Sequence, residues 1–246
     1  MTISRAQLAK ELEPGLNALF GLEYDRYENE AAEIFDSEGS DRAFEEEVML
    51  SGFGTAPVKS EGSAINFDNA QETYTARYTM ETIALAFSIT EEAVEDNLYD
   101  RLAARYTRAL ARSMAQTKQI KGATVLNNAF LATSPIGDGA ALCSAAHPSL
   151  SGNQTNLLAT PADLNETSLE EILIQIAGFT DERGLKIAVR GTKLMIPKEL
   201  QFIAERIINS NLRPGSADND INAMKSMGML PEGAAVNHFF TDADAY

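Results

Sequence analysis

One long helix constrains the fold of this chain more than any other feature. Apolar residues recur at every fourth position of residues 89–121, which predicts a continuous ridge along one helix. The ridge consists of Val94, Leu98, Leu102, Tyr106, Leu110 and Met114. Ser88 and Glu91 fit the S-x-x-E capping box that begins helices, and Gly122 is expected to end this one. Such a helix would span ~50 Å. A compact chain of 246 residues has a radius of gyration of only ~18 Å, so the helix should cross the whole molecule.

Charge is distributed unevenly along the same helix. Acidic residues occupy its first half and basic residues its second half, which complements the helix dipole. The basic residues are Arg101, Arg105, Arg108, Arg112, Lys118 and Lys121. This order supports the helix prediction.

Residues 52–89 read as one long β-hairpin. Residues 60–64 form a turn cluster in which Gly62 can adopt a positive φ. The returning limb alternates, with Tyr74, Ala76, Tyr78 and Met80 on one face. An isolated two-stranded ribbon is marginal in water and leaves its edges unpaired. We therefore expect the ribbon to be covered by the rest of its own fold or by another chain.

The N-terminal fifth of the chain predicts a helix followed by an acidic arm. Residues 4–20 place leucines on one helical face, and Pro14 should break or kink that helix near Glu13. Residues 21–50 contain eleven acidic residues against Arg26 and Arg42. Either this arm is solvated and loosely ordered, or it is extended and orders only against a neighbouring subunit.

The second half of the chain predicts a smaller α/β region. Residues 133–166 are rich in loop-forming residues. A helix should begin at Thr167 or Ser168 and end at Gly184. The strings "LKIAV" and "TKLMIP" predict short buried strands, Pro197 should begin another helix, and "AVNHFFTDADAY" predicts a last strand. The fold class is therefore α+β.

Composition excludes several functions. The formal net charge of −16 argues against binding nucleic acid or an anionic membrane through the general surface. A single cysteine, Cys143, permits no disulfide within the chain. The N-terminus lacks the apolar core of a signal peptide, and no apolar run approaches a membrane span. These features predict a soluble protein made in a cytoplasm.

Candidate catalytic chemistry is sparse. Cys143 and His147 lie four residues apart and could form a nucleophile pair on a helix. Pro148 and the loop-like composition around them argue against that helix, and no third orienting group is evident from spacing. We predict no catalytic, cofactor or metal site. A soluble cysteine-dependent enzyme using these two residues remains an alternative.

The order of these elements resembles the Hong Kong 97-type major capsid protein of tailed phages. Residues 44–60 ("FEEEVMLSGFGTAPVKS") look like the rising limb of that family's extended loop, and residues 190–211 ("RGTKLMIPKELQFIAERIINSN") look like the start of its axial domain. The resemblance implies an N-terminal helix and arm (1–50), an extended hairpin loop (51–89), a spine helix with a peripheral domain (90–185) and an axial domain (186–246). The family's chain usually continues further, so we expect this axial domain to be incomplete.

The resemblance implies a structural role and no enzymatic one. The chain would self-assemble, as pentamers and hexamers, into the icosahedral shell of a virion after synthesis in the bacterial host cytoplasm. A separate scaffolding protein and a portal are implied as partners, with no sequence-specific nucleic acid and no membrane. The expected assembly contacts are Lys59, Glu61, Gly62, Tyr74, Tyr78 and Met80. An encapsulin-type nanocompartment shell, which encloses cargo enzymes, is the alternative with the same fold.

Overall fold

The computed structural model describes residues 9–88, 90, 92, 99–213 and 220–246, and side-chain positions are described outside 9–15 and 99–101. The chain forms two compact units. The first contains the described parts of residues 1–38 and 81–123, and the second contains residues 39–80 and the described parts of 124–246.

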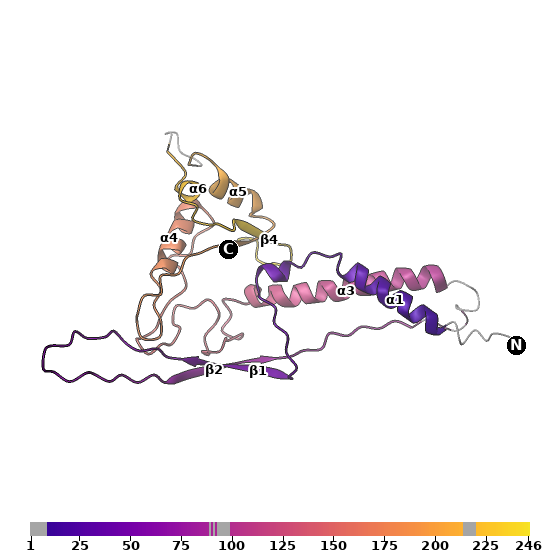
Figure 1. The fold of residues 1–246 in the computed structure, drawn as a ribbon. Helices are drawn as coiled ribbons and strands as arrows, with labels where there is room; N and C mark the ends of the chain where they lie inside the picture. The colour runs from indigo at the N-terminus through magenta and orange to yellow at the C-terminus, as the bar shows by residue number, and fades with distance from the viewer. Residues whose placement is uncertain (1–8, 89, 91, 93–98, 214–219) are drawn as a thin grey trace. The chain divides into compact units, whose positions relative to one another are not determined.

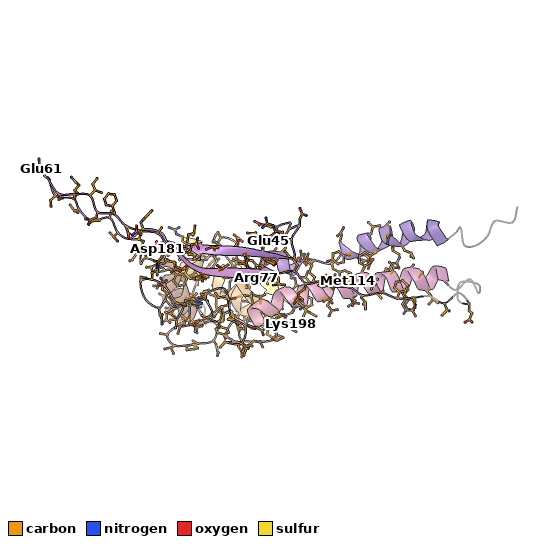
Figure 2. The ribbon with its side chains drawn as sticks, turned by 90° about the horizontal axis from the view of Figure 1, so that it is seen from below. Glu45, Glu61, Arg77, Met114, Asp181 and Lys198 are labelled. Carbon is orange, nitrogen blue, oxygen red and sulfur yellow. The ribbon has the colours of Figure 1, made fainter. Side chains whose placement is uncertain are left out.

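The first unit is built around one long helix. It contains α1 (Ala9–Tyr24), the short 3-10 helix η2 (Glu30–Glu33) and most of α3 (Tyr99–Asn127), whose last residues belong to the second unit. Both views show α1 running alongside α3 (Figures 1 and 2). The buried positions of α3 recur every four residues and carry mostly small side chains, which lets neighbouring backbone approach closely. They are Ala103, Thr107, Ala111, Ala115, Gln119 and Ala123.

The long helix was predicted, but its C-terminal end differs from the prediction. The proposed Ser88–Glu91 cap falls at residues that are partly outside those described. Gly122 does not end α3, which continues to Asn127. The glycine serves close packing instead, because a Cβ there would lie 2.9 Å from the Cβ of Ala31.

The break expected at Pro14 does not occur. Helix α1 is continuous from Ala9 to Tyr24 and passes through Pro14. A proline inside a helix removes a single backbone donor, and that loss does not end this helix.

Part of the acidic arm, residues 21–50, is ordered against its own chain. The backbone N–H of Ala31 donates to Gln119 Oε1 at 2.8 Å, and Gln119 Nε2 donates to Asn29 Oδ1 at 2.9 Å. Gln119 is itself buried. For these residues, the interpretation as an arm that orders only against a neighbouring subunit is wrong.

The hairpin of the second unit lies earlier in the sequence than predicted. Strand β1 (Phe44–Leu50) pairs antiparallel with β2 (Glu72–Thr79), with an irregularity between Val48 and Leu50. Residues 51–71 form the connection, and residues 80–88 carry no strand. The limits of 52–89 were wrong because three consecutive glutamates concealed β1. The rising limb at residues 44–60, given by the resemblance, does include this strand.

Those glutamates are tolerated because the ladder is exposed. Glu46 forms an ion pair with Arg77 across the two strands at 3.0 Å. The Arg77 guanidinium also lies 3.9 Å from the centre of the Phe44 ring. The charges therefore contribute cross-strand contacts instead of opposing the strand.

The core of the second unit lies between three helices and a small parallel sheet. Its elements are α4 (Glu166–Ala177), β3 (Leu194–Pro197), α5 (Gln201–Asn209), α6 (Ala223–Met227) and β4 (Ala234–Asn237), with β3 parallel to β4. The core consists of Leu164, Leu169, Leu173, Leu194, Ile196, Leu200, Ala204, Ile207, Ile208, Met224 and Leu230. The chain is thus a mixed α and β protein.

Strands β3 and β4 confirm two sequence predictions, whereas other boundaries differ. The string "LKIAV" forms no strand beyond a single bridge at Lys186. Helix α4 is capped by Asn165 and ends before Gly178, not Gly184. Pro197 ends β3, and α5 begins at Gln201, because the turn that follows the strand uses the intervening residues.

Candidate assembly surface

The loop between β1 and β2, residues 51–71, is held at its stem by the buried Ser51. Its N–H donates to the carbonyl of Gln71 at 2.8 Å, and its Oγ accepts from the Gln71 N–H at 2.9 Å. The side chain of Ser51 thus extends the ladder by one pair beyond the strands. The loop leaves the hairpin in a fixed direction.

Asp68 fastens the stem a second time. Its Oδ2 accepts from the Gly54 N–H at 2.7 Å, and Arg183 Nη2 donates to Oδ1 at 2.7 Å and Oδ2 at 2.9 Å. The N–H groups of Gly54 and Asn69, followed by the Arg183 guanidinium, lower the pKa of Asp68. A carboxylate with these donors stays ionised and links both limbs of the loop to the turn after α4.

The outer part of the loop extends away from the rest of its unit. Figure 2 shows Glu61 at the far tip and Asp181 near the base. Gly62 has a φ of +79°, and Ser63 donates from both N and Oγ to the Ser60 carbonyl, which closes the turn. The turn predicted at residues 60–64 is therefore present.

Large apolar side chains on this loop face water. Val58 is 98% exposed and Phe67 is 95% exposed, and Phe53 and Ile65 are also exposed. A soluble monomer seldom exposes such a group together, and exposed apolar patches of this kind mark interaction sites. The fixed stem and the apolar outer part together make residues 51–71 a candidate assembly surface, called the assembly loop below.

The structure places the six predicted contact residues in two groups. Lys59, Glu61 and Gly62 lie exposed at the tip of the assembly loop. Tyr78 and Met80 are exposed at the far end of β2, where Tyr78 OH donates to Glu47 Oε2 at 3.3 Å. The Glu47 carboxylate, with some burial, raises the pKa of Tyr78.

Tyr74 differs from the other five because its own chain covers it. A Cβ at Gly137 would lie 3.3 Å from Tyr74 Cδ2 and 2.7 Å from the Cβ of Ala76. Burial, and then the nearby carboxylates of Asp138 and Glu182, raise the pKa of Tyr74. The 135–141 turn packs on this face of β2, so Tyr74 is half-buried in the isolated chain. Its contact with a second subunit stays a prediction.

Cys143 and His147 do not form a nucleophile pair. His147 Nδ1 lies 2.7 Å from Asp138 Oδ2, and Nε2 lies 3.2 Å from Asn156 Oδ1. Asn156 is oriented by accepting from Ser144 N–H and donating to the Leu142 carbonyl. Both nitrogens of the imidazole therefore serve to join loop segments.

Cys143 lines a separate, largely apolar cavity of about 330 Å³ with Phe130, Leu169, Leu194 and Tyr246. Burial raises the pKa of the Cys143 thiol. A thiol with a raised pKa is a poorer nucleophile at neutral pH, because less of it is thiolate. The cysteine-enzyme alternative is therefore not favoured.

Metal-binding and membrane-spanning features are absent from the described part of the chain. No group of three or more His, Cys, Asp or Glu side chains there could hold a metal ion. No described helix combines the length and the apolar character needed to cross a membrane.

Sequence reasoning missed Asp68 and Arg183, which lie 115 positions apart. No local pattern connects them. The exposure of Val58 and Phe67 could have been predicted from the sequence. Both are isolated apolar residues in a segment rich in turn formers, and a short hairpin has no core that could bury them.

Comparison with known proteins identifies the family. A family model described as phage capsid protein matches residues 73–246. The structure resembles the bacteriophage JBD30 capsid with a TM-score of 0.61 at 12% identity, covering 82% of this chain and 88% of that chain. It also resembles the procapsid of bacteriophage JBD30 with a TM-score of 0.60 at 13% identity, covering 96% of this chain and 100% of that chain. No curated protein matches the sequence. The chain belongs to the phage capsid protein family.

Proposed function

We propose that this protein is the major subunit of the icosahedral head of a tailed phage and that copies join through the assembly loop. The observation that carries the proposal is the pair of apolar side chains, Val58 and Phe67, held almost fully exposed on a fastened stem. Membership of the phage capsid family and the likeness to a capsid and a procapsid support it.

The geometry explains how such a loop could contribute to assembly. Burying a fully exposed Val or Phe against a neighbour contributes about 1.5–3 kcal/mol per side chain. A loop ordered only on contact would lose part of that gain to conformational entropy. The Ser51 and Asp68 contacts order the stem in the isolated chain, so more of the contact energy is available for assembly.

The finer architecture is proposed on the same basis. In Hong Kong 97-type terms, residues 1–50 correspond to the N-terminal arm, 51–89 to the extended loop, 90–185 to the spine helix and peripheral domain, and 186–246 to the axial domain. The rising limb of that loop corresponds to residues 44–60, and β1 (Phe44–Leu50) supports this. Copies would form pentamers and hexamers, with a separate scaffolding protein and a portal, after synthesis in the bacterial host cytoplasm.

One alternative carries less support. An encapsulin-type shell shares the fold, but the matching family is a phage capsid family. The net charge of −16 argues against general binding of nucleic acid in either kind of shell. Terminase and portal genes beside this gene would support the phage proposal, and a cargo-enzyme gene there would oppose it.

The experiment compares assembly of the wild-type chain with that of a Val58→Asp/Phe67→Asp variant. Both positions are exposed, so the variant should fold normally by circular dichroism. It should form no closed shells by electron microscopy, because two charges would be buried at the contact. Ile174→Asp is the matched control, since Ile174 is a similarly exposed residue on α4. Normal shells from the double variant would contradict the proposal.

A further inference from the structure

A stripe of arginines lies along α3, away from the assembly loop in sequence. Arg105, Arg108 and Arg112 are all exposed, and their spacing places them within an arc of about 60° on one helix. They extend over about 10 Å of the helix axis. The whole chain has a net charge of −16, so this local concentration of positive charge is a candidate binding surface for an acidic partner.

The stripe borders a groove, and the carboxylates described around it are paired elsewhere. The groove has a volume of about 400 Å³ and is lined by Tyr27, Arg108, Ala109, Arg112, Ser113 and Gln116. Glu23, which accepts from Tyr27 OH, forms an ion pair with Arg26 at 3.7 Å instead. Among the residues that the structure describes, no carboxylate pairs with any of the three arginines of the stripe.

The chain also carries exposed carboxylates without partners. Asp36, Glu38 and Asp41 lie in an exposed segment with no regular secondary structure. None of the described cations pairs with them. The acidic residues that follow are engaged, since Glu45 pairs with Arg42 and Glu46 pairs with Arg77. Residues 36–41, called the acidic segment below, therefore remain available.

The acidic segment begins beyond the stripe of its own chain along α3. The Phe35 ring lies 3.8 Å from the position of a Cβ at Gly122, and Asp36 follows directly. Gly122 is ten residues beyond Arg112, which is about 15 Å along the helix axis. That separation exceeds the Debye length of about 8 Å at physiological ionic strength.

We propose that the arginine stripe is a second subunit contact, which receives the acidic segment of a neighbouring copy of this chain. This inference rests on the proposed shell. Three carboxylates face three guanidinium groups, and every copy brings both, so all copies in a closed shell can be paired. A segment without regular structure, with Gly39 at its centre, can adapt to the groove.

Nucleic acid is the competing partner and fits less well. Phosphates also bind arginine forks, but binding a phosphate polymer requires several cations to replace its counterions. The excess of acidic residues over the whole chain repels such a polymer, whereas a short segment between fixed subunits contacts only the stripe.

The test is a charge exchange in full-length protein that assembles into shells. One variant carries Arg105→Glu, Arg108→Glu and Arg112→Glu, a second carries Asp36→Lys, Glu38→Lys and Asp41→Lys, and a third combines all six. Each reversal alone should lower the shell yield about tenfold or more, and the combination should recover most of it. Lys118→Glu is the control, because Lys118 is exposed on another face of α3.

Each result decides the proposal. Unchanged yields from both folded reversals, or a combined variant no better than either, would overturn it. Normal shells that lose their nucleic acid in the arginine variant would assign the stripe to the genome instead. If reversal prevents folding, Arg108→Gln/Arg112→Gln must lower the yield and weaken its dependence on salt. Failure of the wild-type chain to form shells would instead refute the proposed function.

Discussion

Adding one methyl group at Gly137 should loosen the hairpin from the rest of its unit. A Cβ at this position would lie 2.7 Å from the Cβ of Ala76 and 3.1 Å from its Cα. Ordinary carbon–carbon contacts lie at about 3.5–4.0 Å. Both Ala76 atoms are fixed to the strand, so Gly137→Ala requires β2 or the 135–141 turn to move by about an ångström.

The expected cost is about 1–3 kcal/mol of stability in the free chain, as for other overpacked sites. Chemical denaturation measures this cost, and hydrogen exchange at the amides of Tyr74 and Ala76 reports whether β2 has loosened. Shell assembly should slow, because the hairpin carries the assembly loop. Gly52→Ala is the matched control, since a Cβ at Gly52 meets no atom within 4 Å. If Gly137→Ala matched Gly52→Ala in stability and in exchange, the proposed packing of the turn on β2 would be refuted.

Three further predictions follow from local contacts. Gly122→Ala should displace residues 29–35 from α3, because the new Cβ would lie 2.9 Å from the Cβ of Ala31. The hydrogen-exchange rate of the Ala31 amide should then rise, and an unchanged rate would argue against this contact. The pKa of Asp68 is lowered in the folded chain, so its stabilisation of the stem is complete above the ordinary value of 3.8 and is lost as pH falls through the folded value. The protection factors of the stem amides should therefore fall at low pH in the wild type and already be low at neutral pH in Asp68→Asn. Equal protection factors in both proteins at neutral pH would contradict this. Asn222→Ala should lower the free energy of unfolding by about 1–3 kcal/mol, because the buried amide donates to the Ile207 carbonyl and accepts from Met224 N–H; a stable variant would show that these bonds contribute little.

The features that could be predicted from the sequence are those that local periodicity determines. The apolar ridge predicts α3, and the short apolar runs predict β3 and β4, because each pattern lies within one element. The turn at Gly62 was predictable for the same reason, since its positive φ needs only glycine.

The features that could not be predicted depend on distant partners. Gly122 looked like a helix stop, yet it is a glycine because Ala31 packs there. Strand β1 looked like a solvated acidic run because its Arg77 partner is thirty-one positions from Glu46. The same reason concealed Asp68 and Arg183. Of the expected contacts, Lys59, Glu61 and Gly62 lie on the assembly loop, but no local pattern indicated the two residues that fix its stem.

The most direct test of the account is a cryo-electron microscopy map of particles assembled from this chain. The account predicts closed icosahedral shells in which Val58 and Phe67 of each copy are buried against a neighbouring subunit. Shells in which both side chains remain exposed to solvent, with contacts made elsewhere, would contradict the proposed role of the assembly loop.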